Sequence, residues 1–147
     1  MALEIHVARS STPELVDAFN QLLPQLSTSA EKLTAETLDE VLSWNGNDVL
    51  VARLDGAVVG TLSLVTFPIP TGVRCRIEDV VVDEAARGHG VGDALVQCAL
   101  REARRRGACS VDLTSRPSRE AANRLYQRLG FEQRQSLLYR WAGDTNH

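Results

Sequence analysis

The first forty residues change from an alternating pattern of apolar and polar positions to a helical one. Residues 3–8 alternate apolar and polar side chains, which is the period of a half-buried strand. From Ser11 the apolar residues recur at helical spacing, and Ser11 and Glu14 have the spacing of a capping box. The pattern therefore predicts a strand, and then a helix that begins at Ser11, runs to about Leu23 and is ended by Pro24.

The middle of the chain is predicted to form a second helix followed by three strands. Thr34 can cap this helix, which is expected to run through Trp44. Asp55-Gly56 is a strong signal for a two-residue hairpin turn between two apolar runs. The expected strands are residues 49–54, 57–67 and 73–82, and the expected loop between the last two is residues 68–72.

The last third combines a long amphipathic helix with shorter elements. The predicted elements are a helix over 91–106 that Gly107 ends, a short buried strand over 109–113, a helix over 119–129 capped by Ser118 and closed by Gly130, and a last strand or hairpin over 131–141. Residues 142–147 are predicted to be a disordered tail, so His147 carries no functional weight. Strands and helices in this order imply an α/β (α+β) fold with a mixed, mostly antiparallel sheet of six or seven strands.

Composition narrows the class of protein. At 147 residues the chain is predicted to be a single domain over 1–147. The formal net charge of -3 argues against a general nucleic-acid binder. Cys75, Cys98 and Cys109 lack metal-ligand spacing, and they predict reduced core thiols of a cytoplasmic protein. No apolar run approaches membrane-spanning length and the N-terminus does not have the pattern of a signal sequence, so no membrane is expected among the partners.

Residues 78–92 carry the strongest candidate for chemistry, because an apolar strand, a turn, a glycine-rich loop and a helix start follow one another there. Gly88, Gly90 and Gly92 alternate, so the loop can turn its N–H groups outward, and the helix adds unpaired N–H groups and the positive end of its dipole. A phosphate or pyrophosphate fits this arrangement, and a glycine-lined turn without a ligand is the alternative. The dinucleotide fingerprint G-x-G-x-x-G fits less well, because Asp93 stands where that motif needs glycine.

Two motifs resemble the GNAT superfamily of N-acetyltransferases, of the single-domain bacterial type. Residues 87–92 are similar to its signature R/Q-x-x-G-x-G/A, and residues 123–131 are similar to its helix end N-x-x-Y-x-x-x-G-F. The resemblance implies a GNAT-like sheet flanked by about four helices, acetyl-CoA as cosubstrate without a metal, and acetyl transfer to an amine; a homodimer is expected by analogy. The side chains of His89 and Asp93 are expected to face solvent. The cofactor-binding residues that the resemblance implies are Val80, Val81, Val82, Arg87, Gly88, His89, Gly90, Val91, Gly92, Asp93, Asn123 and Tyr126.

Acetyl transfer to an amine needs a base, because an amine of pKa ~10.4 is almost entirely protonated at pH 7. Glu78 and Asp79 are the catalytic candidates, since they lie inside an otherwise apolar strand just before the loop, in an order that resembles the acceptor-site strand of glucosamine-phosphate acetyltransferases. Neighbouring strand residues point to opposite faces, so one of the two is expected to face the acceptor, and Glu78 is preferred as base or water-positioning residue. The alternative is an ion pair with Arg74 or Arg76.

The resemblance assigns further groups. The backbone N–H groups of Val80–Val82 are expected to bind pantetheine and to stabilise the oxyanion. Tyr126 is expected as the catalytic partner of the leaving thiolate, and Asn123 as a ligand of the pantetheine arm. A packed aromatic side chain on an amphipathic helix is the alternative for Tyr126. Arg116 and Arg119 are expected near the 3′-phosphate of the cofactor.

The sequence thus predicts an acetyl-CoA-dependent N-acetyltransferase that acts on a small-molecule amine. A protein N-terminus or lysine is the competing acceptor, and a non-catalytic acyl-CoA-binding or sensing domain is the alternative from another class. Selectivity is expected to reside in the loops over residues 26–31 and 68–72 and in the C-terminal strands.

Overall fold

The computed structural model describes residues 2–143, and the chain divides between Thr114 and Ser115 into two compact units. The elements of the first unit are β1 (Leu3–Ala8), α1 (Pro13–Leu26), α2 (Ala35–Ser43), β2 (Asn47–Leu54), β3 (Ala57–Ile69), β4 (Gly72–Val82), the 3₁₀-helix η1 (Glu84–Ala86), α3 (Val91–Arg105) and β5 (Ser110–Asp112). The second unit contains α4 (Glu120–Arg128). That all 147 residues act as one functional domain stays a prediction.

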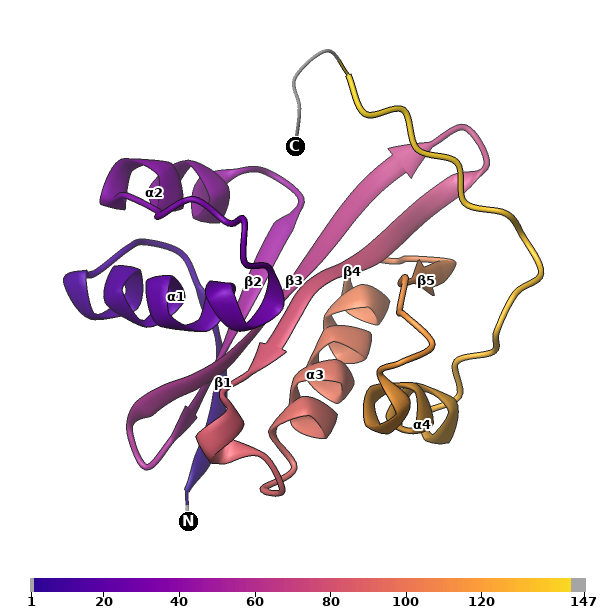
Figure 1. Ribbon diagram of the computed structural model, residues 1–147. Coiled ribbons are helices and arrows are strands. Elements are labelled where there is room, and N and C mark those ends of the chain that lie inside the picture. The colour runs from indigo at the N-terminus through magenta and orange to yellow at the C-terminus, as the bar shows by residue number, and fades with distance from the viewer. Residues whose placement is uncertain (1, 144–147) are drawn as a thin grey trace. The chain divides into compact units, whose positions relative to one another are not determined.

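A five-stranded mixed sheet forms the centre of the first unit (Figure 1). The strand order is β1-β2-β3-β4-β5; the first four strands are antiparallel to their neighbours, and β5 runs parallel to β4. Helices α1 and α2 cover one face and α3 covers the other (Figure 1). The mixed, mostly antiparallel sheet is confirmed. The prediction of six or seven strands is wrong for the described residues, because residues 131–143 adopt no regular secondary structure.

The hairpin between β2 and β3 forms at the predicted turn. Asp55 and Gly56 have φ angles of 50° and 87°, and two consecutive positive values are what a type I′ turn requires. Leu54 then pairs with Ala57, so the turn contains two residues. The local sequence signal was sufficient here, because the turn geometry follows from the residue types.

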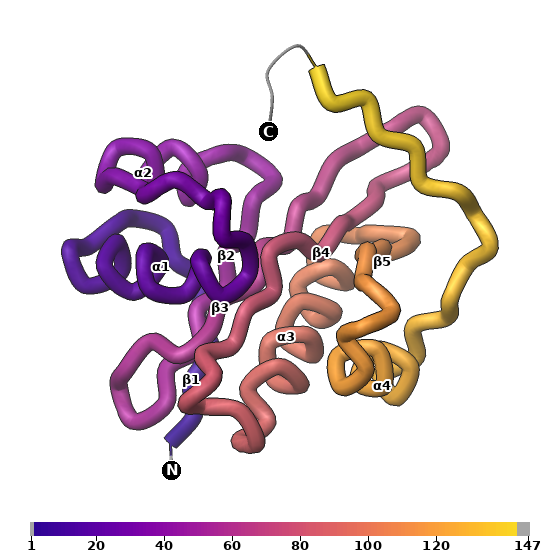
Figure 2. Tube along the Cα trace, viewed as in Figure 1, coloured from indigo at the N-terminus to yellow at the C-terminus, as the bar shows by residue number. Residues whose placement is uncertain are grey.

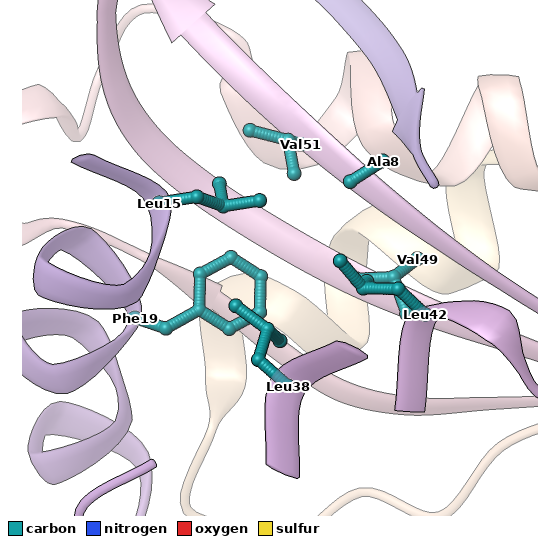
Figure 3. Packing of buried hydrophobic residues seen from close by; sticks show 7 residues of the cluster. All are labelled: Ala8, Leu15, Phe19, Leu38, Leu42, Val49 and Val51. Carbon is teal, nitrogen blue, oxygen red and sulfur yellow. The ribbon is translucent and has the colours of Figure 1, made fainter. Parts of the chain in front are cut away.

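A cluster of apolar side chains joins α1 and α2 to the sheet (Figure 3). Phe19 of α1 and Leu38 of α2 meet the valines of β2 in this cluster. Its buried members are Ala8, Leu15, Phe19, Leu38, Leu42, Val49 and Val51. A fully buried large apolar side chain contributes about 1.5–3 kcal/mol, so this cluster holds the two helices firmly against one face of the sheet.

Helix α1 differs from its prediction at both ends. Its N-cap is Thr12 rather than Ser11, because the Thr12 hydroxyl accepts a hydrogen bond from the N–H of Leu15 at 3.1 Å. Pro24 lies inside the last turn and does not end the helix, which continues to Leu26. A proline so close to the C-terminus removes a single intrahelical hydrogen bond, and the burial of the apolar face outweighs that loss.

The next two helices follow their predictions closely. The hydroxyl of Thr34 caps α2 by accepting a hydrogen bond from the N–H of Thr37 at 3.1 Å. Helix α3 ends one residue earlier than predicted, and Gly107 after it has a φ of 76°, as the expected glycine stop requires.

Two predictions for the sheet are wrong. Strand β3 continues through Pro68, which pairs with Val73, so the expected loop shrinks to a turn at residues 70 and 71. Pro68 is tolerated because it lies near the end of the strand. Strand β5 has three residues and none of them is buried, in contrast to the buried strand expected over 109–113.

The three cysteines have different environments. All are free thiols, but Cys75 is buried, Cys98 is half-buried and Cys109 is exposed. The prediction of core thiols therefore holds for Cys75 and is wrong for Cys109, which directly precedes β5.

In the second unit, α4 begins without the predicted cap. Arg119 occupies the N-cap position in place of Ser118, and no side chain caps the helix. Gly130 follows the helix with a φ of 98°, so the predicted closure is confirmed. Of the predicted disordered tail, residues 142 and 143 have no regular secondary structure, and residues 144–147, His147 among them, lie outside the described part of the chain.

Candidate active site

A cavity of about 120 Å³ lies between helices α1 and α2 and strands β2, β3 and β4. Its lining residues are Phe19, Leu23, Leu33, Leu38, Val41, Val49, Thr61, Ser63 and Asp79. Six of these side chains are hydrocarbons, two carry hydroxyl groups, and Asp79 is the charged member. The cavity thus brings one of the two predicted acidic residues to a mostly apolar wall.

A β-bulge in β4 places Asp79 at this wall. Glu78 pairs with Ser63 and Val81 pairs with Thr61, so two residues of β4 lie opposite one residue of β3. Asp79 is one of the two, with a φ of 50° in the left-handed region. A bulge re-aims the side chains of a strand, and strained backbone of this kind is frequent at functional sites. Strict alternation along β4, which the sequence reasoning assumed, therefore fails at the catalytic candidates.

The two acidic residues differ in their electrostatic environment. Partial burial raises the pKa of the Asp79 carboxyl above its usual range, and the negative charge of Glu78 raises it further. Glu78 is exposed, and its Oε2 forms an ion pair with Nε of Arg76 at 2.9 Å. Arg76 also donates a hydrogen bond to the hydroxyl of Thr114 at 3.1 Å. The ion pair that was the alternative to a catalytic role is thus present for Glu78.

Beyond the bulge, one edge of β4 is free. Strand β5 pairs with β4 at Arg74, Cys75 and Arg76. From Ile77 to Val82 that edge has no strand partner among the described residues. The side chain of Val81 is buried, whereas Val80 and Val82 are half-buried. Backbone groups on an unpaired edge are available to an extended ligand, as β-augmentation requires.

The chain then passes from β4 through η1 and the glycine loop into α3 (Figure 2). Asp83 caps η1, since its Oδ1 accepts a hydrogen bond from the N–H of Ala85 at 3.1 Å. Gly88 and Gly90 have φ angles of 87° and 74°, and a Cβ added at either would meet nothing within 4 Å. Gly90 is the N-cap of α3, so no side chain caps that helix. The first N–H groups of α3 are therefore left to an external acceptor, and Gly92 lies in this first turn.

Some side chains around the glycine loop face solvent, and others are held against the protein. Arg87 and His89 are exposed, as expected for His89, and Val91 is buried. Asp93 accepts a hydrogen bond from Nε2 of Gln97 one turn later, so its carboxylate is held along the helix. The loop therefore presents backbone to solvent and anchors itself through Val91.

Three positioning residues were missed by sequence reasoning. Gly60 lets the start of α3 approach the sheet, because a Cβ there would lie 3.2 Å from Cγ1 of Val91 and 3.3 Å from Cδ1 of Leu95. Gln25 ties the end of α1 to η1, since its Oε1 accepts a hydrogen bond from the N–H of Glu84 at 3.1 Å. Asn20 holds Leu33 of the cavity wall through two hydrogen bonds between its amide and the Leu33 backbone. These partners lie far apart in the sequence, and no local pattern signals them.

Asn123 and Tyr126 lie in the second unit, and their roles toward the loop stay predictions. The N–H of Phe131 donates to the carbonyl of Tyr126 at 2.9 Å and that of Gly130 to Gln127 at 3.1 Å, which is a Schellman motif. The Tyr126 and Phe131 rings meet edge to face at 5.8 Å. The spacing Y-x-x-x-G-F is thus also a helix-ending device.

The polar groups of Asn123 and Tyr126 are in different states. Nδ2 of Asn123 donates a hydrogen bond to the carbonyl of Arg116 at 3.0 Å, so this amide braces the turn before α4. Burial raises the pKa of the Tyr126 phenol, and the positive charge of Arg119 opposes that shift. A phenol with a raised pKa stays protonated at neutral pH and can act as a proton donor.

Among residues 2–143, no helix is both long and apolar enough to cross a membrane. The same residues contain no group of three or more His, Cys, Asp or Glu side chains that could hold a metal ion.

This chain is similar to known proteins in sequence and in structure. Residues 14–131 match the model of the acetyltransferase (GNAT) family. N-acetyltransferase 8B of Homo sapiens is 33% identical over 136 residues, which cover 82% of this chain and 60% of the relative. Glucosamine 6-phosphate N-acetyltransferase 1 of Oryza sativa subsp. japonica is 34% identical over 105 residues, which cover 67% of this chain and 62% of the relative.

A solved structure of a Trypanosoma brucei acetyltransferase has a TM-score of 0.76 with this chain at 27% identity, covering 96% of this chain and 100% of the other. The chain spans about three fifths of the length of the two curated relatives, 60% and 62%.

Proposed function

Because this chain belongs to the acetyltransferase (GNAT) family, we propose that it moves an acetyl group from acetyl-CoA to a primary amine by direct attack in a ternary complex. One observation carries the proposal. Residues 79–92 supply an acidic cavity residue, an unpaired strand edge and an uncapped glycine loop, in that order. An amine, a pantetheine arm and a pyrophosphate need these three features in the same order.

The residues of the first unit fit acetyl-CoA, which supplies the activated acetyl thioester. The N–H groups of Gly88–Asp93 hold the pyrophosphate, and Arg87 adds a positive charge beside them. Backbone groups of Val80–Val82 along the free edge of β4 would hold the pantetheine arm, as they would hold an added strand. The open Cβ positions at Gly88 and Gly90 support this assignment, because they leave room for a phosphate against the backbone.

Asp79 is the proposed base in place of Glu78, because Asp79 lines the cavity and Glu78 is paired with Arg76. Its carboxylate takes a proton from the ammonium of the acceptor, and the neutral nitrogen attacks the thioester carbon. The C–N bond forms, the C–S bond breaks, and the second nitrogen proton leaves to solvent. The N–H groups within Val80–Val82 that face the free edge of β4 stabilise the oxyanion, each by roughly 3 kcal/mol.

In the second unit, Tyr126 is proposed to protonate the leaving thiolate, and Asn123 to position the pantetheine arm. The raised pKa of the Tyr126 phenol supports the first role, because the proton donor is then present at neutral pH. The bond between Asn123 and the Arg116 carbonyl uses one donor of the amide and leaves its oxygen for the cofactor.

A small-molecule amine is the proposed acceptor. A cavity of about 120 Å³ suits a small substituent better than an extended polypeptide. The rice relative named above acts, by its name, on a small amino sugar phosphate, which supports a small acceptor in this family.

We also propose a cytoplasmic location and a homodimer. Three free thiols, one of them exposed, fit a reducing compartment. The dimer rests on analogy within the family. Size-exclusion chromatography with light scattering measures the second proposal directly, and a mass equal to one chain of 16.1 kDa would contradict it.

A ligand titration tests the proposed function. Thermal-shift and calorimetric titrations with acetyl-CoA, CoA and NAD should show binding of the two CoA species and none of NAD, since a ligand of the folded state raises its melting temperature. Thiol release with a panel of amines then measures turnover. Binding without turnover on any amine would favour the non-catalytic acyl-CoA-binding domain, and no binding of either CoA species would reject both functions.

A further inference from the structure

The chemistry of the cavity wall points to the nature of the acceptor. Hydrocarbon side chains form most of the wall, and no lysine, arginine or histidine lines it. We propose, on the basis of the function proposed above, that the acceptor is a primary amine with a small hydrocarbon substituent, an alkyl chain or a single aromatic ring. The substituent fills the cavity, and the ammonium group lies at Asp79.

Burial along the wall gives the cavity a closed end and an open one. Leu38, Val49 and Thr61 are at most 2% exposed, so they form the inner end. Val41 is 38% exposed and Asp79 is also exposed, so these two form the rim. The charge therefore lies where the amine nitrogen has to meet the acetyl donor, and the apolar surface lies beyond it. An amphiphilic amine matches this gradient from charged rim to apolar interior.

The hydroxyl proton at the inner end already has an acceptor. The Thr61 hydroxyl donates a hydrogen bond to the carbonyl of Leu50 at 2.8 Å, within the buried sheet. A sugar hydroxyl or a phosphate placed at this end would exchange its water for hydrocarbon contacts, which is unfavourable without new partners. A methylene chain or a ring loses nothing there. The inner end thus selects against polar substituents.

The volume sets an upper size for the substituent. The cavity of about 120 Å³ is slightly smaller than an engineered apolar cavity of ~150 Å³ in another protein, which binds benzene. One ring or a short alkyl chain therefore approaches the limit, and a disaccharide exceeds it.

The wall is preformed, because Asn20 holds one of its members in place. Oδ1 of Asn20 accepts a hydrogen bond from the N–H of Leu33 at 2.8 Å, and Nδ2 donates to the carbonyl of Leu33 at 3.1 Å. The amide thus holds both backbone groups of Leu33, which directly precedes the N-cap of α2. Preorganisation of this kind favours binding of small ligands, which have few contacts to stabilise an ordered loop.

A series of linear alkylamines tests the proposal. Thiol release is measured with ethylamine through hexylamine, phenethylamine, ethanolamine, glucosamine and glucosamine 6-phosphate at saturating acetyl-CoA. Each methylene that enters the cavity should raise kcat/KM about fourfold, and the rise should stop when the cavity is full. A kcat/KM that is flat along the series, or that is highest for a polar amine, overturns the proposal and leaves acetyl transfer itself intact.

A rim substitution connects the selectivity to the cavity. Val41→Phe places a larger side chain at the exposed rim, where it should not disturb folding, and shortens the cavity. The best chain length should fall by at least two carbons, whereas Ser43→Phe, which puts the same side chain on an exposed position of the same helix outside the lining, should leave it unchanged. An equal optimum in wild type and Val41→Phe would reject this cavity as the binding site.

Turnover and binding are measured separately, so that the two proposals can fail independently. If no amine is acetylated, the proposed function fails, and calorimetry with hexylamine and glucosamine 6-phosphate on CoA-saturated protein decides the site. Binding of hexylamine that weakens in Val41→Phe supports the apolar site. No binding of hexylamine, or tighter binding of glucosamine 6-phosphate, overturns it.

Discussion

Glu78 and Asp79 are neighbours in the sequence, but only Asp79 lines the cavity, whereas Glu78 is paired with Arg76. The bulge of β4 opposite β3 causes this difference, because it gives Asp79 a φ of 50° and breaks the alternation of the strand. Asp79 is thus both the residue with the left-handed backbone and the charged residue of the cavity. This coincidence makes Asp79 the position at which the proposed mechanism is tested most directly.

Asp79→Asn should reduce kcat/KM by about 10²–10⁴-fold, because it removes a general base and keeps the shape of the side chain. Asparagine also tolerates the left-handed conformation, so the variant should fold, whereas alanine would add backbone strain. Steady-state thiol release measures the loss. Glu78→Gln is the matched control and should change kcat/KM only a few-fold. Comparable losses in the two variants would contradict the assignment of the base.

The raised pKa of Asp79 predicts a pH dependence of stability. Between the ordinary carboxyl pKa, 3.8 for aspartate, and the raised value, the folded chain binds more protons than the unfolded chain. The contribution of Asp79 to the free energy of unfolding should therefore fall as the pH rises through this window. Urea unfolding of wild type and Asp79→Asn from pH 3.5 to 7 measures it, and the stability of the variant relative to wild type should increase with pH. A relative stability that is constant or decreases would contradict the raised pKa.

Gly90→Ala should weaken acetyl-CoA binding at least tenfold while the protein stays folded. A Cβ at Gly90 meets nothing within 4 Å, so the direct cost is the positive φ, about 1–2 kcal/mol of stability. Relief of that strain re-aims the N–H groups of the loop. Gly56→Ala is the matched control, since it has a φ of 87° and open space but lies in a hairpin turn. Calorimetry should find its Kd unchanged, and equal Kd values for the two variants would reject the phosphate site.

Asp48→Asn should destabilise the first unit by about 3 kcal/mol, because a fully buried carboxylate joins two arginines. Its Oδ1 lies 2.8 Å from Nη2 of Arg9 and 3.0 Å from Nη2 of Arg106, and its Oδ2 lies 3.1 Å from Nε of Arg106. The three residues tie the end of β1 and the start of β2 to the end of α3. Urea unfolding measures the change. Glu102→Gln, in the more exposed pair with Arg105, should leave the midpoint nearly unchanged.

Tyr126→Phe should lower kcat and leave the Kd of CoA unchanged, because the ring contact with Phe131 remains and the proton donor is lost. Burial raises the pKa of this phenol, so any basic limb of the wild-type kcat profile that reports it should lie above pH 10 and disappear in the variant. Phe131→Leu is the control for packing: it removes the ring contact and should lower stability without removing that limb. An unchanged kcat in Tyr126→Phe would assign the final protonation to water.

The spacing of Tyr126, Gly130 and Phe131 is limited as sequence evidence for a catalytic tyrosine, for a physical reason. Tyr126, Gly130 and Phe131 form a Schellman motif with its hydrophobic contact, so their spacing is explained by the end of a helix alone. The family motif and the end of the helix thus require the same residue types at the same positions. In the glycine loop, no packing contact requires Gly88 or Gly90, and their positive φ angles are what favours glycine there.

The sequence by itself determined the features that depend on neighbouring residues. The Asp55-Gly56 turn, the Thr34 cap and the glycine loop before α3 follow from residue types whose backbone preferences and hydrogen bonds are local. Because their signals need no distant partner, they were predicted at nearly correct boundaries.

The tertiary structure decided what depends on register and packing. The slip between Thr61 and Ser63 opposite β4 placed Asp79 rather than Glu78 at the cavity, and the register of two strands cannot be read from one of them. The cavity arises where α1 and α2 meet the sheet, and its wall relies on Asn20 holding Leu33 across thirteen residues of sequence. Contacts between residues far apart in the sequence fix the positions of Asp79 and Leu33. Such contacts depend on the burial of both partners together and not on the local conformational preference of either residue.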